Sequence, residues 1–223
     1  MKVYLIFLTI VSIVNVTSIA LQKEWSRCIS KVLIVPSLLA AYVTVKGFHD
    51  PFIIAALVFG WIGDILLIKN MSGIVFKLGI LSFLLGHLFY IAAFIDFLGT
   101  LSFLSAFIWL INIRTLAAVV PLIIIGGIFV FRLIKPSGEM VPFVIIYMII
   151  ILSMAFWGLH IFILIPGLAG FMICIGCLLF IVSDTMLAYY TFRKPMVLTS
   201  VMVMVLYILA QTGIVMGFML LRS

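Results

Sequence analysis

The chain has 223 residues, of which 67% are hydrophobic and 9% are charged. Soluble domains are about 25% charged and about 45–50% apolar, so this composition excludes an ordinary soluble domain and a disordered chain. Three cysteines exclude a disulfide scaffold, and long unbroken apolar runs differ from the short alternating strands of an outer-membrane barrel. We therefore predict an all-α polytopic membrane helix bundle that forms a single transmembrane domain over residues 1–223.

Eight segments are candidate membrane spans, since a span needs roughly 20 predominantly apolar residues and the edges of each segment are uncertain by a few residues. In chain order they are 3–21, 32–47, 51–69, 76–97, 115–134, 141–159, 167–191 and 197–221. Segment 101–112 is apolar but short, so we predict that it is re-entrant or interfacial. The first segment also has the features of a cleavable signal peptide, although its apolar stretch is long for one.

Basic residues lie singly or in pairs between the apolar runs, an arrangement that favours loops that orient the helices over a nucleic-acid surface. Nine border one set of alternate loops: Lys23, Arg27, Lys31, Lys69, Lys77, Arg132, Lys135, Arg193 and Lys194. Four border the other set: Lys2, Lys46, Arg114 and Arg222. The positive-inside rule places the first set in the cytoplasm and both termini outside, and we expect a bacterial inner (plasma) membrane.

Two acids break the rule that charges mark segment ends. Asp64 and Asp184 lie inside apolar runs, where a central Asp costs about 2.5–3.5 kcal/mol on insertion scales. A small residue, Gly63 or Ser183, precedes each acid and allows a neighbouring helix to approach closely. Both acids fall in the predicted cytoplasmic half of the membrane. They are candidates for a catalytic pair, a proton or cation pathway, or hydrogen bonds that hold the bundle together.

Further polar side chains lie on compatible helices. His87 lies in mid-span with Tyr90 on the same face, and Tyr207 and Gln211 are four residues apart on the last helix. We predict that these four groups support or orient the acids, although a buried polar side chain often only satisfies one hydrogen bond.

Sequence signals for other chemistry are weak. The three His show no metal-ligand spacing such as H-E-x-x-H, so we expect no metal and no cofactor. Cys174 and Cys177 form C-x-x-C inside an apolar helix and are interpreted as packing residues. Neither a G-x-S-x-G elbow nor a phosphate-binding glycine loop is present.

Four sets of residues together resemble the YhhN-like lysoplasmalogenase family, from about residue 30 to residue 217. The first signature is Gly63-Asp64-Ile65-Leu66-Leu67, Leu78-Gly79, Phe83, Gly86-His87, Tyr90 and Phe94, and the middle span contributes Tyr147 and Met154. The later signatures are Phe180, Ser183-Asp184, Leu187-Ala188 and Phe192, then Tyr207 and Ala210-Gln211. Ser30-Lys31 is similar to another family position, but Val32 follows where the family usually has Pro.

The resemblance implies an integral membrane ether hydrolase of about eight helices. Family members cleave the vinyl ether of lysoplasmalogens to a fatty aldehyde and glycerophospho-ethanolamine or -choline, and their catalytic acids match Asp64 and Asp184. Such a reaction requires no cofactor, because a carboxylic acid protonates the vinyl ether and a carboxylate activates water. We expect a lysophospholipid substrate from the bilayer and no nucleic-acid partner; the sequence does not indicate the oligomeric state. Candidate headgroup contacts are Lys31, Lys69, Lys77, Arg193 and Lys194.

Two other functions use the same pair of acids. A proton- or ion-coupled transporter would carry ions past them. An intramembrane aspartyl protease would use them directly, but G-x-G-D is absent here because Trp61 stands where the first Gly would be.

Overall fold

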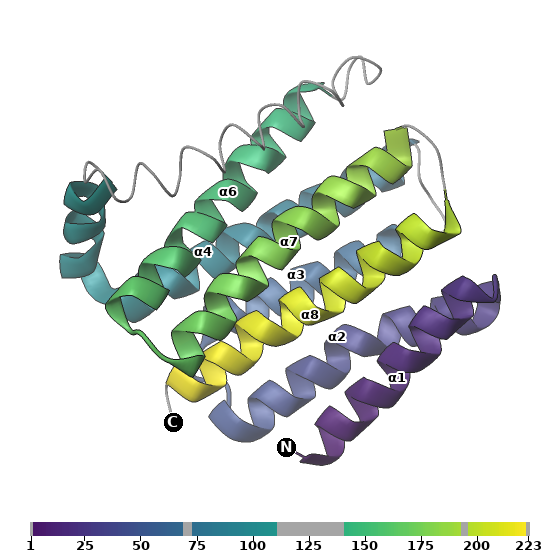
Figure 1. The fold of residues 1–223 in the computed structure, drawn as a ribbon, viewed down its shortest axis with the longest axis horizontal. Coiled ribbons are helices and arrows are strands. Elements are labelled where there is room, and N and C mark those ends of the chain that lie inside the picture. The colour runs from purple at the N-terminus through teal and green to yellow at the C-terminus, as the bar shows by residue number, and fades with distance from the viewer. Residues whose placement is uncertain (1, 69–72, 111–140, 193–195, 222–223) are drawn as a thin grey trace.

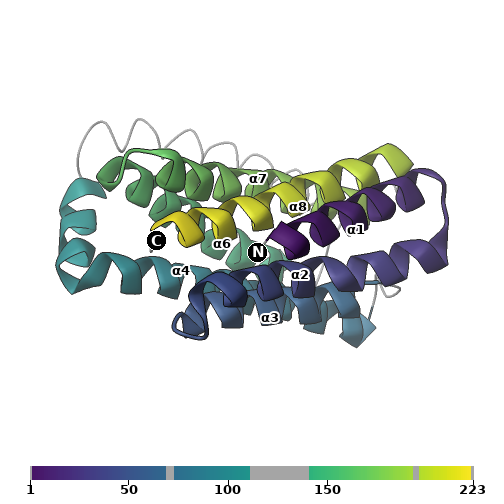
Figure 2. The same ribbon diagram turned by 90° about the horizontal axis from the view of Figure 1, so that it is seen from below.

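A computed structural model describes residues 2–68, 73–110, 141–192 and 196–221 of the chain (Figure 1). Seven helices and no strand occur among these residues, so the predicted all-α bundle is confirmed. The helices are α1 (Lys2–Ala20), α2 (Glu24–Lys46), α3 (Pro51–Leu66), α4 (Gly73–Leu110), α6 (Val141–Leu164), α7 (Leu168–Phe192) and α8 (Val197–Leu221). Their long axes run roughly side by side (Figures 1 and 2).

Six described helices are long and apolar enough to cross a membrane, which makes the chain an integral membrane protein with several spans. α3 is shorter, with 16 residues, or roughly 24 Å at 1.5 Å per residue. Its predicted span of 51–69 was too long at the carboxyl end, where the helix stops at Leu66 and a turn follows. Asp64 therefore lies within one turn of the end of α3. The predicted span 115–134 lies outside the described residues.

The predicted start of the second span was wrong by eight positions. We expected a loop up to residue 31, but α2 already begins at Glu24. A search for long apolar runs misses these turns because Arg27 and Lys31 interrupt the run. The side chains of Arg27 and Lys31 line a cavity inside the bundle. The two charges therefore do not face the lipid, and the helix can extend beyond its apolar stretch.

The last part of α4, beyond Gly99, is helical as far as Leu110. Gly99 interrupts α4 with a left-handed backbone conformation (φ 74°) that favours glycine, and the chain beyond it turns away from the axis of α4 (Figure 2). Residues 100–110 extend for roughly 16 Å at 1.5 Å per residue, too short a length to cross the membrane. The predicted re-entrant or interfacial character of 101–112 stays a prediction, and its last two residues lie outside the described chain.

Both termini lie at one end of the bundle, opposite the turn between α1 and α2 (Figure 1). α1 packs against α2 and α8. Its buried Asn15 donates hydrogen bonds to the Ser30 hydroxyl at 2.9 Å and to the Arg27 carbonyl at 3.0 Å. In this structure α1 is therefore an integral helix of the bundle and helps to form its interior.

α7 and α8 form the most extensive helix pair, and glycines allow their close approach. A Cβ atom on Gly176 would lie 2.9 Å from the backbone oxygen of Ala210, and one on Gly213 would lie 3.0 Å from that of Met172. Real Cβ atoms do not approach backbone so closely, so these positions require glycine. The close contact fixes α8 against α7 and sets Tyr207 relative to Asp184.

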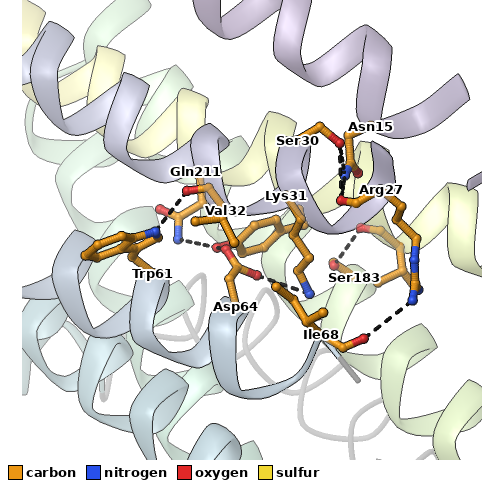
Figure 3. A network of polar contacts seen from close by, with 12 residues as sticks. Asn15, Arg27, Ser30, Lys31, Val32, Trp61, Asp64, Ile68, Ser183 and Gln211 are labelled. Carbon is orange, nitrogen blue, oxygen red and sulfur yellow. Dashed lines mark hydrogen bonds and ion pairs between the residues drawn. The ribbon is translucent and has the colours of Figure 1, made fainter. Parts of the chain in front are cut away.

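A proline in α2 creates a contact that anchors α3. Pro36 has no N–H, so the carbonyl of Val32, four residues earlier, lacks its helical partner. The indole nitrogen of Trp61 donates to this carbonyl at 2.9 Å (Figure 3). Because Val32 and Trp61 are close neighbours of Lys31 and Asp64 along the chain, the bond also holds these two charges near each other.

Candidate active site

A cavity of about 200 Å³ opens inside the bundle at the end where α1 turns into α2 and α7 into α8. Six helices contribute to its lining: Asn15 from α1, Lys31 from α2, Asp64 from α3, Phe83 from α4, Asp184 from α7 and Tyr207 from α8. The structure thus brings both intramembrane acids to one cavity, although they are 120 positions apart in the sequence. We call this cavity the acid chamber.

Asp64 is fully buried and has two polar partners. The ammonium nitrogen of Lys31 lies 3.3 Å from Oδ1, and the Tyr207 hydroxyl donates to Oδ2 at 2.7 Å. Figure 3 shows Lys31 extending from α2 toward the carboxylate. A buried carboxylate requires this kind of pairing, since an isolated charge would be very costly to bury. The contacts favour the ionised form of Asp64.

A hydrogen-bond chain on α4 and α8 ends at the same carboxylate. The Tyr90 hydroxyl donates to Oε1 of Gln211 at 2.5 Å, and Nε2 of Gln211 donates to the Tyr207 hydroxyl at 3.5 Å. Tyr207 in turn donates to Asp64. Every bond in the chain points its donor toward Asp64, so the dipoles reinforce one another and stabilise negative charge there. Three of the predicted supporting residues, Tyr90, Tyr207 and Gln211, thus lie together on the Asp64 side.

The surroundings of Asp184 differ from those of Asp64. The Tyr147 hydroxyl of α6 donates to Oδ2 of Asp184 at 2.5 Å, and Nε2 of His87 lies 3.5 Å from the same oxygen. Nδ1 of His87 is 2.6 Å from the carbonyl of Phe83, which can only accept, so Nδ1 carries a proton. Nε2 is buried and faces Asp184, and it has no hydrogen-bond partner among the described residues.

The small residue before each acid has the expected packing role. A Cβ atom on Gly63 would lie 2.7 Å from the ring of Phe83, so glycine makes room for this ring beside Asp64. The Ser183 hydroxyl donates to the carbonyl of Val203 in α8 at 3.0 Å. Each small residue therefore admits a neighbouring helix next to its acid.

Aromatic rings fill the space between the two polar clusters. Phe180 makes edge contacts with His87 at 4.8 Å and with Tyr207 at 5.6 Å between ring centroids. Phe83 meets Tyr207 at 6.0 Å. These rings exclude water from much of the site, and their faces attract positive charge.

A second, apolar cavity of about 70 Å³ adjoins the acid chamber between α4, α6 and α7. Ile80, Val144 and Met148 contribute to its walls. We call it the apolar channel. Asp184 lines both the channel and the chamber, whereas Asp64 lines only the chamber. Asp184 therefore lies where polar and apolar surroundings meet.

Some predicted headgroup residues have unexpected positions. Lys31, which we expected to contact a lipid headgroup, faces Asp64 inside the bundle. Lys77 lies 6.0 Å from the ring centroid of Phe143. The other three, Lys69, Arg193 and Lys194, lie outside the described residues.

Three residues of the site were not among the predicted site residues. Tyr147 was noted only as part of the family resemblance, although a tyrosine inside an apolar span is itself a signal. Asn15 and Arg27 line the chamber from helices that the sequence did not place beside the acids. No group of three or more His, Cys, Asp or Glu able to hold a metal occurs in the described parts of the chain.

Fold and site together define a class, a polytopic helical membrane protein with two aspartates on one buried cavity. Comparison with family models matches residues 26–218 to the YhhN family. The chain belongs to the YhhN family, and the predicted resemblance is confirmed. No curated protein and no solved structure matches the chain. The whole of α1 precedes the matched region, although Asn15 and Ile19 of this helix line the acid chamber.

Proposed function

We propose that this protein is a lysoplasmalogenase-type ether hydrolase that cleaves the vinyl ether of a lysoplasmalogen. The observation that carries the proposal is the pair of unlike acids on one chamber: Asp64 has a cationic partner, and Asp184 faces His87 and Tyr147 at the boundary of an apolar channel. Membership of the YhhN family supports the same activity.

The two cavities suit a single-chain amphiphile. The alkenyl chain enters the apolar channel between α4, α6 and α7, and the glycerol and phosphate lie in the acid chamber on the side of Arg27 and Lys31. A vinyl ether joins the chain to the glycerol, so it comes to lie where the cavities meet. Asp184 occupies that junction.

Asp184 acts as the proton donor in this mechanism. It transfers its proton to the β-carbon of the vinyl ether, which converts the double bond to a single bond and leaves an oxocarbenium ion on the ether carbon. Tyr147 orients the carboxyl group, and His87 returns a proton to it for the next cycle. The resulting cation is stabilised by the remaining carboxylates and by the rings of Phe83 and Phe180.

Asp64 acts as the base. Its carboxylate removes a proton from water as the water oxygen bonds to the cationic carbon, and a hemiacetal forms. The hemiacetal then breaks its bond to the glycerol oxygen, which takes the proton from Asp64, while the hemiacetal hydroxyl loses its proton, by way of His87, to Asp184. A fatty aldehyde and glycerophospho-ethanolamine or -choline are released. One water is consumed in total. Lys31 and Tyr207 keep Asp64 ionised for this step.

The test is aldehyde release from lysoplasmenylethanolamine by the purified protein. We expect Asp64→Asn and Asp184→Asn each to lower kcat by about 10²–10⁴-fold, the usual contribution of a general acid or base. Asp96→Asn, at an exposed acid just before the kink at Gly99 in α4, is the matched control and should retain activity. Full activity in either active-site variant would overturn the mechanism. Hydrolysis of ester or alkyl-ether lysolipids but not of vinyl ethers would overturn the proposed substrate. Flux of protons or ions across liposomes that contain the protein, without hydrolysis, would favour a transporter.

We also propose a bacterial plasma membrane with both termini outside. The site end of the bundle carries Lys23, Arg27, Lys31 and Lys77, whereas Lys2 and Lys46 lie at the opposite end. This asymmetry supports a cytoplasmic site end. A reporter fused to the C-terminus that is active only outside the cytoplasm tests the orientation, and a cytoplasmic reporter signal would reverse it.

A further inference from the structure

A third cavity, of about 500 Å³, lies at the turn between α1 and α2 and the start of α8. It shares Ile19, Arg27 and Ser200 with the acid chamber, so the two cavities adjoin each other. We call it the mouth. Gln22 and Glu24 also line it, and the wall is more polar than that of the apolar channel.

The mouth has one negative and one positive side chain. Glu24 and Arg27 are three positions apart in the first turns of α2, so they lie on the same side of the helix, with Cβ atoms about 5–6 Å apart. Within the described parts of the chain neither side chain forms an ion pair. The guanidinium of Arg27 makes one long hydrogen bond, to the carbonyl of Ile68 at 3.4 Å (Figure 3). Both charges therefore retain hydrogen-bonding capacity for a ligand.

We infer that the mouth is a subsite for a zwitterionic phosphodiester headgroup, in which Arg27 binds the phosphate and Glu24 binds the ammonium group. This inference rests on the proposed function, because the ligand is the headgroup of the same lysolipid. In a phosphoethanolamine the two charges are separated by only two carbon atoms, which suits two side chains that project from neighbouring turns of one helix. Arginine is well suited to phosphate because its planar guanidinium can donate two parallel hydrogen bonds.

The position of the mouth agrees with the direction in which the substrate lies. Moving from the mouth inward, a ligand meets Arg27, then Lys31 and Asp64 in the chamber, and then Asp184 at the apolar channel. In a lysoplasmalogen the charged headgroup is followed by the ether bond and then by the apolar chain. The charged mouth, the two acids and the apolar channel follow one another in the same order. Glu24 adds discrimination, since an anionic headgroup without an amine would meet a like charge there.

Binding of non-cleavable saturated alkyl-ether lysolipids tests the subsite without requiring catalysis. The full-length protein in uncharged detergent is titrated by competition against a fluorescent alkyl-ether lysolipid. The headgroups compared are phosphoethanolamine, phosphocholine, phosphoglycerol and phosphate, together with the neutral alkylglycerol. For the wild type we expect the two zwitterionic lipids to bind about three- to fivefold more tightly than the anionic ones, the size of a partly exposed charge interaction.

The variants separate the two roles. Glu24→Gln should abolish the preference for zwitterions, and Arg27→Gln should weaken every phosphate-bearing ligand about tenfold while leaving alkylglycerol unchanged. The charge-matched controls are Lys23→Gln, at an exposed neighbour that does not line the mouth, and Asp96→Asn, just before the kink at Gly99 in α4. An unchanged headgroup ratio in Glu24→Gln, or equal losses for alkylglycerol and phospholipids in Arg27→Gln, would overturn the inference.

Failure of the proposed function gives a different result. If the wild type binds the zwitterionic lysolipids with the stated preference but releases no aldehyde from a vinyl ether, the subsite stands and the reaction is wrong. If aldehyde is released at equal efficiency from every headgroup and the binding ratio is one, the reaction stands and the subsite is wrong.

Discussion

Replacement of Lys31 by Met tests whether Asp64 is held as a carboxylate by a cation. The ammonium nitrogen of Lys31 lies 3.3 Å from Oδ1 of Asp64. The Lys31 side chain is 19% exposed and the Asp64 side chain is 2% exposed. At an effective dielectric constant of about 20, two unit charges at this distance attract by about 5 kcal/mol. Much of this attraction offsets the cost of removing both charges from water. Removal of one partner of a buried ion pair destabilises a protein by about 3–5 kcal/mol. Because Lys31 is partly exposed, we expect a loss at the lower end of this range.

We therefore expect Lys31→Met to lower the free energy of unfolding by about 3 kcal/mol. For a chain of this size that corresponds to a midpoint roughly 6–12 °C lower, measured by thermal unfolding in detergent. Lys31→Met/Asp64→Asn removes both charges, so it should be more stable than Lys31→Met alone. Lys77→Met is the control, because this lysine lies over the ring of Phe143 near the same end of the bundle.

The same variants have an expected effect on activity. Lys31→Met should reduce kcat by about 10²-fold or more, since it leaves the base without the cation that keeps it ionised. Lys31→Arg retains the charge and should recover part of the rate. The reasoning is refuted if the stability losses of the two single variants simply add in the double variant, because uncoupled losses mean that the charges do not stabilise each other.

Three further predictions concern other parts of the bundle. Tyr147→Phe removes the hydrogen bond to Asp184 and should lower kcat by roughly ten- to a hundredfold at a cost of about 1 kcal/mol in stability; an unchanged kcat with a changed melting midpoint would assign Tyr147 to packing alone. Gly176→Leu forces a side chain against the backbone of α8 and should destabilise the protein by about 3 kcal/mol or more, and a midpoint equal to that of the wild type would contradict the close helix contact. Cys174→Ala/Cys177→Ala should retain activity with and without a chelator, because both cysteines are buried packing residues; loss of aldehyde release in either assay would point to thiol or metal chemistry.

The sequence alone determined the membrane class, the family and the two acids. The class follows from composition and the family from the order and spacing of its signatures. The two acids follow from one strong free-energy term: a charge inside an apolar span is so costly that it occurs mainly where function or a partner requires it. Asp64 and Asp184 stand out for this reason. The small residues beside them were informative in the same way, because Gly63 and Ser183 mark helix contacts that the structure contains.

Only the tertiary structure decided how the two acids differ. In a membrane protein both the lipid and the protein interior are apolar, so the hydrophobic pattern does not indicate which face of a helix points inward. The sequence therefore could not show that Lys31 faces Asp64, that Tyr147 and His87 face Asp184, or that α1 closes the chamber with Asn15. These partners are set by the rotation of each helix about its axis and by close contacts such as Gly176 on α8. That rotation pairs one acid with a lysine and leaves the other facing a histidine and a tyrosine at the edge of an apolar channel.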